Sequence, residues 1–132
     1  MITELKYFTF EDFDCPYSRF PDTGFKYMDR EFLSMLHEAR RLCKIKFKIL
    51  KGYVSPDGVL MANELSNSSH LIGRACEIWC KDNYKRYRIM TALLEVGFTR
   101  IGFSHDRIYV DNDDMKPDAI WYFQRKIAKR FK

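Results

Sequence analysis

The feature that most constrains the fold of this 132-residue chain is segment 68–77, in which His70 and Glu77 stand seven residues apart with Gly73 between them. Glycine permits a positive φ or a close backbone approach that other residues disfavour. The residues that follow, 74–79, alternate as in a half-buried strand, so every second side chain shares a face. We therefore expect Glu77 to point toward His70 across a short loop.

The chemistry of this pair is that of a metal site. Imidazole nitrogen and carboxylate oxygen both bind zinc directly, and a catalytic zinc ion takes three protein ligands and keeps one position open for water. His70 and Glu77 supply two of the three. The same residues also fit a plainer interpretation, a polar loop that runs into a strand.

Segment 68–77 resembles the zinc-ligand signature Ser-x-His-x-x-Gly-x-Ala-x-Asp of the D-alanyl-D-alanine carboxypeptidase-like zinc peptidases. Further segments follow the order found in that family, between about residues 7 and 121: 7–13, 28–33, 52–56, 97–102 and 108–111. The resemblance implies an α+β fold of the Hedgehog/DD-peptidase type, a single compact domain with a small, mainly antiparallel sheet flanked by helices. It also implies zinc-dependent hydrolysis of D,D- or L,D-peptide bonds in peptidoglycan peptides.

The resemblance assigns roles residue by residue. His70 matches the first zinc ligand, and Glu77 stands where the family has aspartate. Tyr109 replaces the third ligand, a histidine in the family, and a neutral phenol with a reference pKa near ~10 is a poor zinc ligand at pH 7. Asp106 stands where some members carry the catalytic acid/base. Val54 replaces an arginine that often binds substrate, so this chain departs from the pattern at three positions, Glu77, Tyr109 and Val54.

Substrate contacts are expected from Ser68 and Ser69 in the loop before His70, and from Tyr53. His105 is an alternative third metal ligand. It shares the strand parity of Tyr109, but four extended residues span roughly 13 Å at ~3.3 Å each, so a turn or bulge must intervene. His37 lies away from the apolar stripe of its helix and is expected at the surface or its boundary.

The cysteines are expected to be reduced thiols, because nothing in the sequence indicates export, although their even number could pair if the protein were released to an oxidising space. Cys76 and Cys80 share the strand face opposite Glu77 and are predicted to be core thiols rather than zinc ligands. Cys15, near a proline in a loop, is predicted to be the most exposed of the four.

The net charge of +5 is concentrated at the C-terminus, where residues 124–132 carry five basic side chains and no acid. We therefore divide the chain into a peptidase-like domain, 1–123, and a basic tail, 124–132. Apolar side chains recur at helical spacing toward this end, at Ile120, Phe123, Ile127 and Phe131. They predict a helix with one apolar and one cationic side, which could dock on the domain, contact an anionic membrane or contact phosphates, or simply be solvated or frayed.

The remaining pattern predicts the scaffold. Asp29 caps a helix over 30–43, and a second helix over 84–96 runs through Tyr87, Met90, Leu93 and Leu94 to Gly97. Strands are predicted over 47–53, 99–103 and 107–111, and a loop from Ser55 to Ser68 is expected to rim the cleft.

Residues 1–6 lack the basic start and apolar core of a secretory signal, and no segment resembles a transmembrane span. We expect a protein that is cytoplasmic as made. By analogy, a small peptidase-like chain of this kind suggests a phage gene product that reaches the cell wall at lysis.

Two functional hypotheses follow. In the first, the chain is a zinc metallopeptidase, a carboxypeptidase or endopeptidase, that hydrolyses or grips peptidoglycan peptides. In the second, replacement of the family histidine by Tyr109 and of the arginine by Val54 has left a catalytically inactive module that binds a protein, an anionic membrane or nucleic acid.

Overall fold

The computed structural model describes residues 5–62 and 64–124 of the chain. They form an α+β fold around one five-stranded sheet with the strand order β1-β2-β4-β3-β5. The strands are Ile49–Lys51 (β1), Ala75–Trp79 (β2), Arg100–Phe103 (β3), Arg107–Asp111 (β4) and Ala119–Tyr122 (β5). Neighbours pair antiparallel except β3 and β5, which are parallel. The predicted fold class, α+β with a mainly antiparallel sheet, is confirmed.

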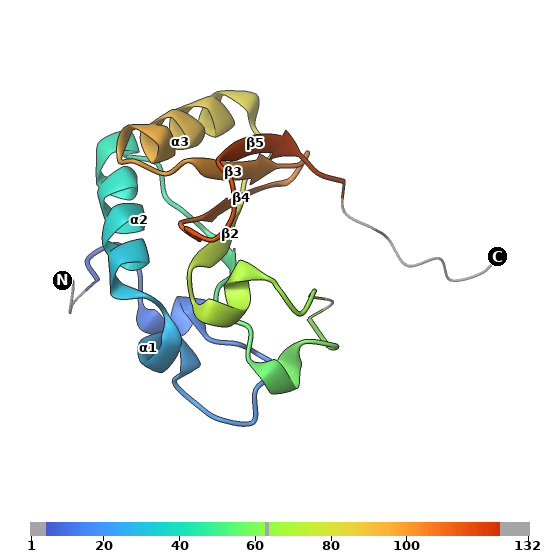
Figure 1. Ribbon diagram of the computed structural model, residues 1–132. Coiled ribbons are helices and arrows are strands. Elements are labelled where there is room, and N and C mark those ends of the chain that lie inside the picture. The colour runs from blue at the N-terminus through green and yellow to red at the C-terminus, as the bar shows by residue number, and fades with distance from the viewer. Residues whose placement is uncertain (1–4, 63, 125–132) are drawn as a thin grey trace.

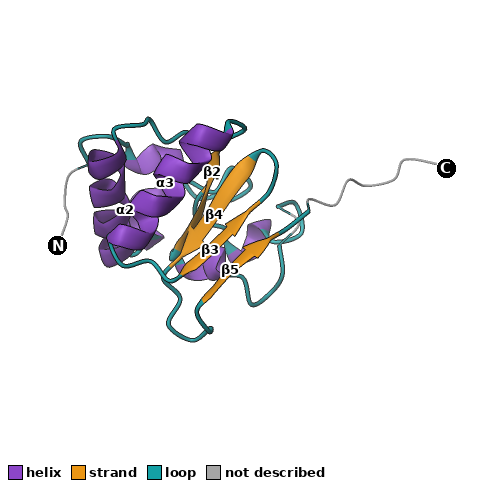
Figure 2. Cartoon of the chain, turned by 90° about the horizontal axis from the view of Figure 1, so that it is seen from above, coloured by secondary structure: helices purple, strands orange, loops and turns teal. Residues whose placement is uncertain are grey.

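Two long helices, α2 (Arg30–Cys43) and α3 (Asn83–Glu95), pack together and cover one face of the sheet (Figures 1 and 2). The short helical turns lie below the sheet in Figure 1: Phe10–Phe13 (η1), Thr23–Tyr27 (α1), Pro56–Gly58 (η2) and Ser69–Ile72 (η3). No helix within the described ranges is long and apolar enough to cross a membrane.

The sheet has one apolar and one polar face, because successive strand residues point to opposite sides. Buried aliphatic side chains of the central strands join α2 and α3 in the hydrophobic core, among them Ile78, Ile101, Ile108 and Val110. The opposite face carries charged and aromatic groups that stand side by side in the strand register: Glu77 opposite Tyr109, and Arg100 opposite Asp111. The candidate site is built on this polar face.

Helix α2 forms where the sequence predicts it. The Asp29 side chain accepts a hydrogen bond from the Phe32 amide at 2.8 Å and caps the N-terminus, and Lys44 ends the helix in the left-handed conformation. The predicted apolar stripe is fully buried: Phe32, Leu36, Ala39 and Cys43. This helix supplies much of the core between the sheet and the two long helices.

Helix α3 lies where it is predicted, but its buried face differs. The buried residues are Ile89, Ala92 and Leu93, whereas Tyr87 is 64% and Leu94 is 44% exposed. The apolar spacing at Tyr87, Met90, Leu93 and Leu94 therefore locates the helix but does not mark its buried face. The helix is apolar on more than one side, so periodicity alone does not select the face that meets α2.

The predicted helical spacing does not hold at Ile120 and Phe123, the two of its residues that precede the tail. Residues Ala119–Tyr122 form β5, and the Phe123 amide continues the pairing by donating to the Phe103 carbonyl at 2.8 Å. Pairing with β3 satisfies backbone groups that a helix would satisfy locally. The rest of the predicted tail helix, 125–132, lies outside the described residues.

Two smaller predictions are confirmed only in part. The strand predicted over 47–53 is regular only over Ile49–Lys51, with a register irregularity against β2. Cys15 is the most exposed of the four cysteines, as predicted, but at 5% exposure it is still buried; its amide donates to the Thr23 hydroxyl at 2.8 Å, and Ser55 Oγ lies 3.5 Å from its sulfur. Cys76 and Cys80 are free and buried, as predicted for core thiols.

Gly73 forms the sharp turn between η3 and β2, with φ at 69°. A Cβ at this position would lie 2.0 Å from the Tyr27 carbonyl oxygen, and the Gly73 carbonyl accepts a hydrogen bond from the Asp29 amide at 2.9 Å. Only glycine combines this conformation with such a close approach. The turn ties the segment that carries His70 to the start of α2.

We expect Gly73→Ala to lower the free energy of unfolding by at least about 2 kcal/mol, because backbone strain and a collision act together. Gly97→Ala is the matched control, since Gly97 also has a positive φ but its Cβ would meet only Met35 Cε at 3.7 Å. Urea denaturation measures both variants. Equal losses would show that the contact with Tyr27 contributes nothing.

Candidate metal centre

A pocket of about 520 Å³ opens on the polar face of the sheet. Its wall includes Glu77 from β2, Arg107 from β4 and Lys51 at the end of β1, and Glu64 closes it from the loop before η3. His70 lies directly behind Glu77 and is 2% exposed. The predicted approach of Glu77 to His70 is confirmed, with 3.5 Å between Oε2 and Nε2.

The His70 ring is held in one orientation by its own loop. Ser68 Oγ accepts a hydrogen bond from the His70 amide at 3.1 Å and caps η3. On the other side, Nδ1 lies 2.8 Å from the Gly52 carbonyl oxygen. A carbonyl only accepts, so Nδ1 carries a proton, and Nε2 is the ring nitrogen that faces Glu77. A backbone carbonyl on the distal nitrogen is the usual support of a metal-binding histidine.

Among the described residues, His70 Nε2 finds no hydrogen-bond partner although it is buried. In the neutral ring its lone pair faces a carboxylate oxygen 3.5 Å away, so a positive species is needed between them, either a second proton on the ring or a metal ion. With zinc–ligand bonds near 2.1 Å, adjacent ligand atoms of a tetrahedron lie about 3.4 Å apart. The separation of Nε2 from Oε2 fits the edge of such a site.

Glu64 is the third donor of the group. Its carboxylate oxygen, His70 Nε2 and a Glu77 oxygen all lie within 4.8 Å of one another. The Glu64 amide donates to the Val59 carbonyl at 3.0 Å, which fixes the loop that carries it. One imidazole and two carboxylates are a ligand set that zinc accepts, so these residues could hold a metal ion.

Two cations balance the carboxylates. Lys51 Nζ lies 2.5 Å from Glu64 Oε2 and 3.9 Å from Glu77 Oε2, and Arg107 donates to Glu77 Oε1 at 2.8 Å. Burial alone raises the pKa of Glu77, but the contact with the His70 imidazole, the charge of Lys51 and the hydrogen bond from Arg107 outweigh it and lower the pKa to about 2. Glu77 is therefore ionised at neutral pH, as a metal ligand must be.

Tyr109, predicted as the third ligand, lies beside His70 with ring centroids 5.6 Å apart and nearly perpendicular planes. Its hydroxyl donates to Asp111 Oδ2 at 2.5 Å. Burial, together with this bond and the charge of Asp111, raises the pKa of the phenol, which keeps it protonated. Tyr109 therefore packs against the imidazole while its hydroxyl is bound to Asp111. The oxygen that lies close to both His70 and Glu77 comes from Glu64.

The predicted acid/base, Asp106, borders the site through Arg107. Its Oδ1 accepts from Arg107 Nε and from Ser104 Oγ, each at 3.1 Å, and the bond from Arg107 lowers the pKa of Asp106. The alternative ligand His105 is exposed in the turn before β4 and is not brought to the group. His105 stays outside the group because four residues of largely extended chain separate it from Tyr109, which packs against His70.

The predicted substrate contacts separate into two kinds. Tyr53 lines the pocket and stacks on Tyr27 with centroids 5.0 Å apart. Ser69 is buried and donates to Asp113 Oδ2 at 2.6 Å, while Ser68 caps η3, so both serines support the position of His70. Val54 is buried in the wall, and its amide donates to the His70 carbonyl at 3.1 Å.

His37 is confirmed as a boundary histidine. It is partly exposed on α2, and its Nε2 accepts a hydrogen bond from the Lys6 amide at 3.2 Å. It has no part in the group around His70.

Sequence analysis missed Glu64, Lys51 and Arg107. Glu64 lies in a loop without periodicity, so only the fold brings it to His70. The sequence indicates the position of Arg107 only weakly. Arg107 shares the strand face of Tyr109, and it pairs with Trp79, two residues along β2 from Glu77. Lys51 likewise carries no motif that distinguishes it from the other lysines.

A scan against models of protein families finds no match to this chain, and a search of curated proteins finds none either.

The choice between Glu64 and Tyr109 as third ligand has a direct test. We expect Glu64→Gln to weaken zinc binding by more than about tenfold, because an ionised donor is lost. Tyr109→Phe should leave zinc affinity nearly unchanged and lower the free energy of unfolding by about 1–3 kcal/mol, because Asp111 loses a donor. Competition with a chromogenic chelator measures zinc affinity. The reverse pattern would assign the third position to Tyr109.

Proposed function

We propose that this chain is a divergent zinc-peptidase-like domain that acts on peptidoglycan peptides, with the metal held by His70, Glu77 and Glu64. The observation that carries the proposal is the buried, unpartnered Nε2 of His70, aimed at Glu77 and fixed in tautomer by the Gly52 carbonyl. The resemblance of segment 68–77 to the zinc-ligand signature supports the same function from the sequence.

In this proposal a bound zinc ion would polarise the scissile carbonyl and activate a water molecule. The chain's own residues position the substrate. Arg107 lines the pocket with its guanidinium held by Glu77 and Asp106, so it presents fixed positive charge where negative charge develops on a carbonyl oxygen. Arg107 would thus supply, from another strand, the positive charge that the family's arginine supplies at the position of Val54.

Asp106 is the proposed proton carrier. Its carboxylate is bound to Arg107, and the resulting low pKa makes it a weak base near neutral pH. We therefore expect slow turnover. Tyr53, backed by Tyr27, offers the peptide an aromatic wall.

The first test is metal content and cleavage together. Protein purified without a metal-affinity tag should bind close to one zinc ion per chain by elemental analysis, and His70→Ala should lose it. His105→Ala is the matched control, because that histidine is exposed and outside the group. The zinc-loaded protein should hydrolyse muropeptides, and a chelator should stop it. Bound zinc without cleavage would reject the peptidase while keeping the metal centre.

One contact favours the second candidate function, a non-catalytic module. Lys51 Nζ bridges Glu64 and Glu77 and so supplies positive charge where a metal would otherwise act. In that case the pocket is closed by an internal ion pair, and the chain binds a protein, an anionic membrane or nucleic acid. The basic tail would contribute, and its residues 125–132 lie outside those described.

Lys51→Met separates the two functions. Without metal, the variant should lose about 1–3 kcal/mol of unfolding free energy, because two poorly solvated carboxylates lose their shared donor. If the site binds zinc, added zinc should restore the melting temperature of the variant and bind more tightly than in the wild type. Lys48→Met, an exposed lysine outside the pocket, is the control. A loss that zinc does not restore would favour the non-catalytic module.

A further inference from the structure

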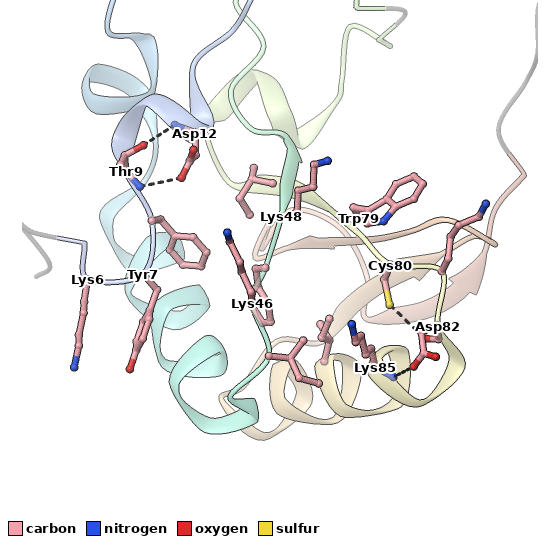
Figure 3. Close-up of a pocket in the computed structure, with 16 residues that line it drawn as sticks. Lys6, Tyr7, Thr9, Asp12, Lys46, Lys48, Trp79, Cys80, Asp82 and Lys85 are labelled. Carbon is pink, nitrogen blue, oxygen red and sulfur yellow. Dashed lines mark hydrogen bonds between the residues drawn. The ribbon is translucent and has the colours of Figure 1, made fainter.

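A second and larger pocket, about 960 Å³, lies apart from His70, between the N-terminal segment, residues 45–49 and the start of α3. Figure 3 shows Lys46 in the middle of this pocket, with Tyr7 on one side and Lys85 and Trp79 on the other. Five lysines line it, and we call it the lysine groove: Lys6, Lys46, Lys48, Lys81 and Lys85. All five are exposed.

The backbone places these lysines by simple rules. Exposure alternates along residues 46–48, so Lys46 and Lys48 lie on the groove side while Phe47, at 4% exposure, enters the core. The Trp79 amide donates to the Lys48 carbonyl at 2.9 Å, which sets the indole beside that lysine. Lys85 comes from the first turn of α3.

The positive charge of the groove is not neutralised by ion pairs. Within residues 5–62 and 64–124, none of the five lysines forms a salt bridge. The two acids in the wall serve the backbone instead. Asp12 Oδ2 accepts from the Thr9 amide at 2.9 Å, and Asp82 Oδ2 accepts from the Lys85 amide at 2.8 Å. The groove therefore has an unmatched excess of cations, which an anionic ligand would complement.

The groove also contains an accessible aromatic surface. Trp79 is 41% exposed, and Lys81 Nζ lies 5.8 Å from its ring centroid. Tyr7 is less suited to stacking, because the Arg40 guanidinium already covers its ring at 4.4 Å and His37 packs against it. An exposed indole among lysines is the combination that binds unpaired bases and their phosphates together.

We propose that the lysine groove binds single-stranded nucleic acid, with the lysines on successive phosphates and Trp79 stacked on a base. The concave shape disfavours a flat membrane surface, and a volume near the upper end of the roughly 300–1,000 Å³ of ordinary ligand pockets suits a few nucleotides rather than a duplex. A polyanion without bases would contact the lysines but make no stacking contact with the exposed indole of Trp79. This inference does not depend on the proposed metal site.

The charge contribution is tested with a fluorescent oligothymidylate in anisotropy titrations over a series of salt concentrations. For single strands, the slope of log affinity against log salt is about 0.7 per phosphate contact, so the double variant Lys46→Glu/Lys48→Glu should reduce it by about 1.4. Lys26→Glu, at an exposed position outside the groove, should leave the slope unchanged. All chains keep the same C-terminal basic residues. An equal effect of the two charge changes would overturn the proposal.

The stacking contribution separates nucleic acid from other polyanions. Trp79→Ala should weaken oligothymidylate binding on the order of tenfold, Trp79→Phe should recover most of it, and the salt slope should stay the same. Inorganic polyphosphate, duplex DNA and anionic phospholipid vesicles are the competitors, and each should displace the oligonucleotide less well than unlabelled oligothymidylate. If Trp79→Ala binds like the wild type, or if polyphosphate competes equally, the groove is a general polyanion surface and the proposal fails.

Discussion

The carboxylate of Asp111 organises the polar face of the sheet. It is fully buried at the end of β4 and accepts from Arg100 Nε at 2.9 and 3.1 Å, from the Tyr109 hydroxyl at 2.5 Å and from the Asp113 amide at 3.0 Å. A buried charge is tolerated only when its hydrogen bonds are complete, because desolvation costs several kcal/mol per ion. These bonds therefore fix β3 against β4, the Tyr109 ring and the turn after β4 at once.

The position of His70 depends on that arrangement. The Tyr109 ring, held by Asp111, packs against the imidazole, and Asp113, held by the same carboxylate, accepts from Ser69 immediately before His70. Lys116 adds a bond to the Ser69 hydroxyl at 3.0 Å. A histidine enclosed in this way loses little further freedom when it binds an ion, so the support around it is a form of preorganisation.

Sequence reasoning reached the parts of the fold that local pattern determines. The cap at Asp29, the turn at Gly73 and the alternation of β2 each depend on neighbouring residues, and each was predictable. The parallel pairing of β5 was not, because apolar spacing at Ile120 and Phe123 also fits a helix and only contact with β3 decides. Glu64 was missed for the same reason: its role arises from a tertiary contact that no spacing in its loop encodes.

The charge balance of the site decides between a metal and an internal ion pair. Three carboxylates, Glu64, Glu77 and Asp106, face two cations, Lys51 and Arg107, which leaves one negative charge without metal. A divalent ion would reverse the sign of the site, and departure of Lys51 toward solvent would bring it back to neutral. Lys51 is the cation that can leave at least cost, because its side chain is 25% exposed against 11% for Arg107, and its Nζ lies 3.9 Å from Glu77 whereas Arg107 donates to both of its carboxylates at 2.8 and 3.1 Å. The affinity of the site for a metal ion therefore depends on the free energy needed to break the ion pair between Lys51 and Glu64.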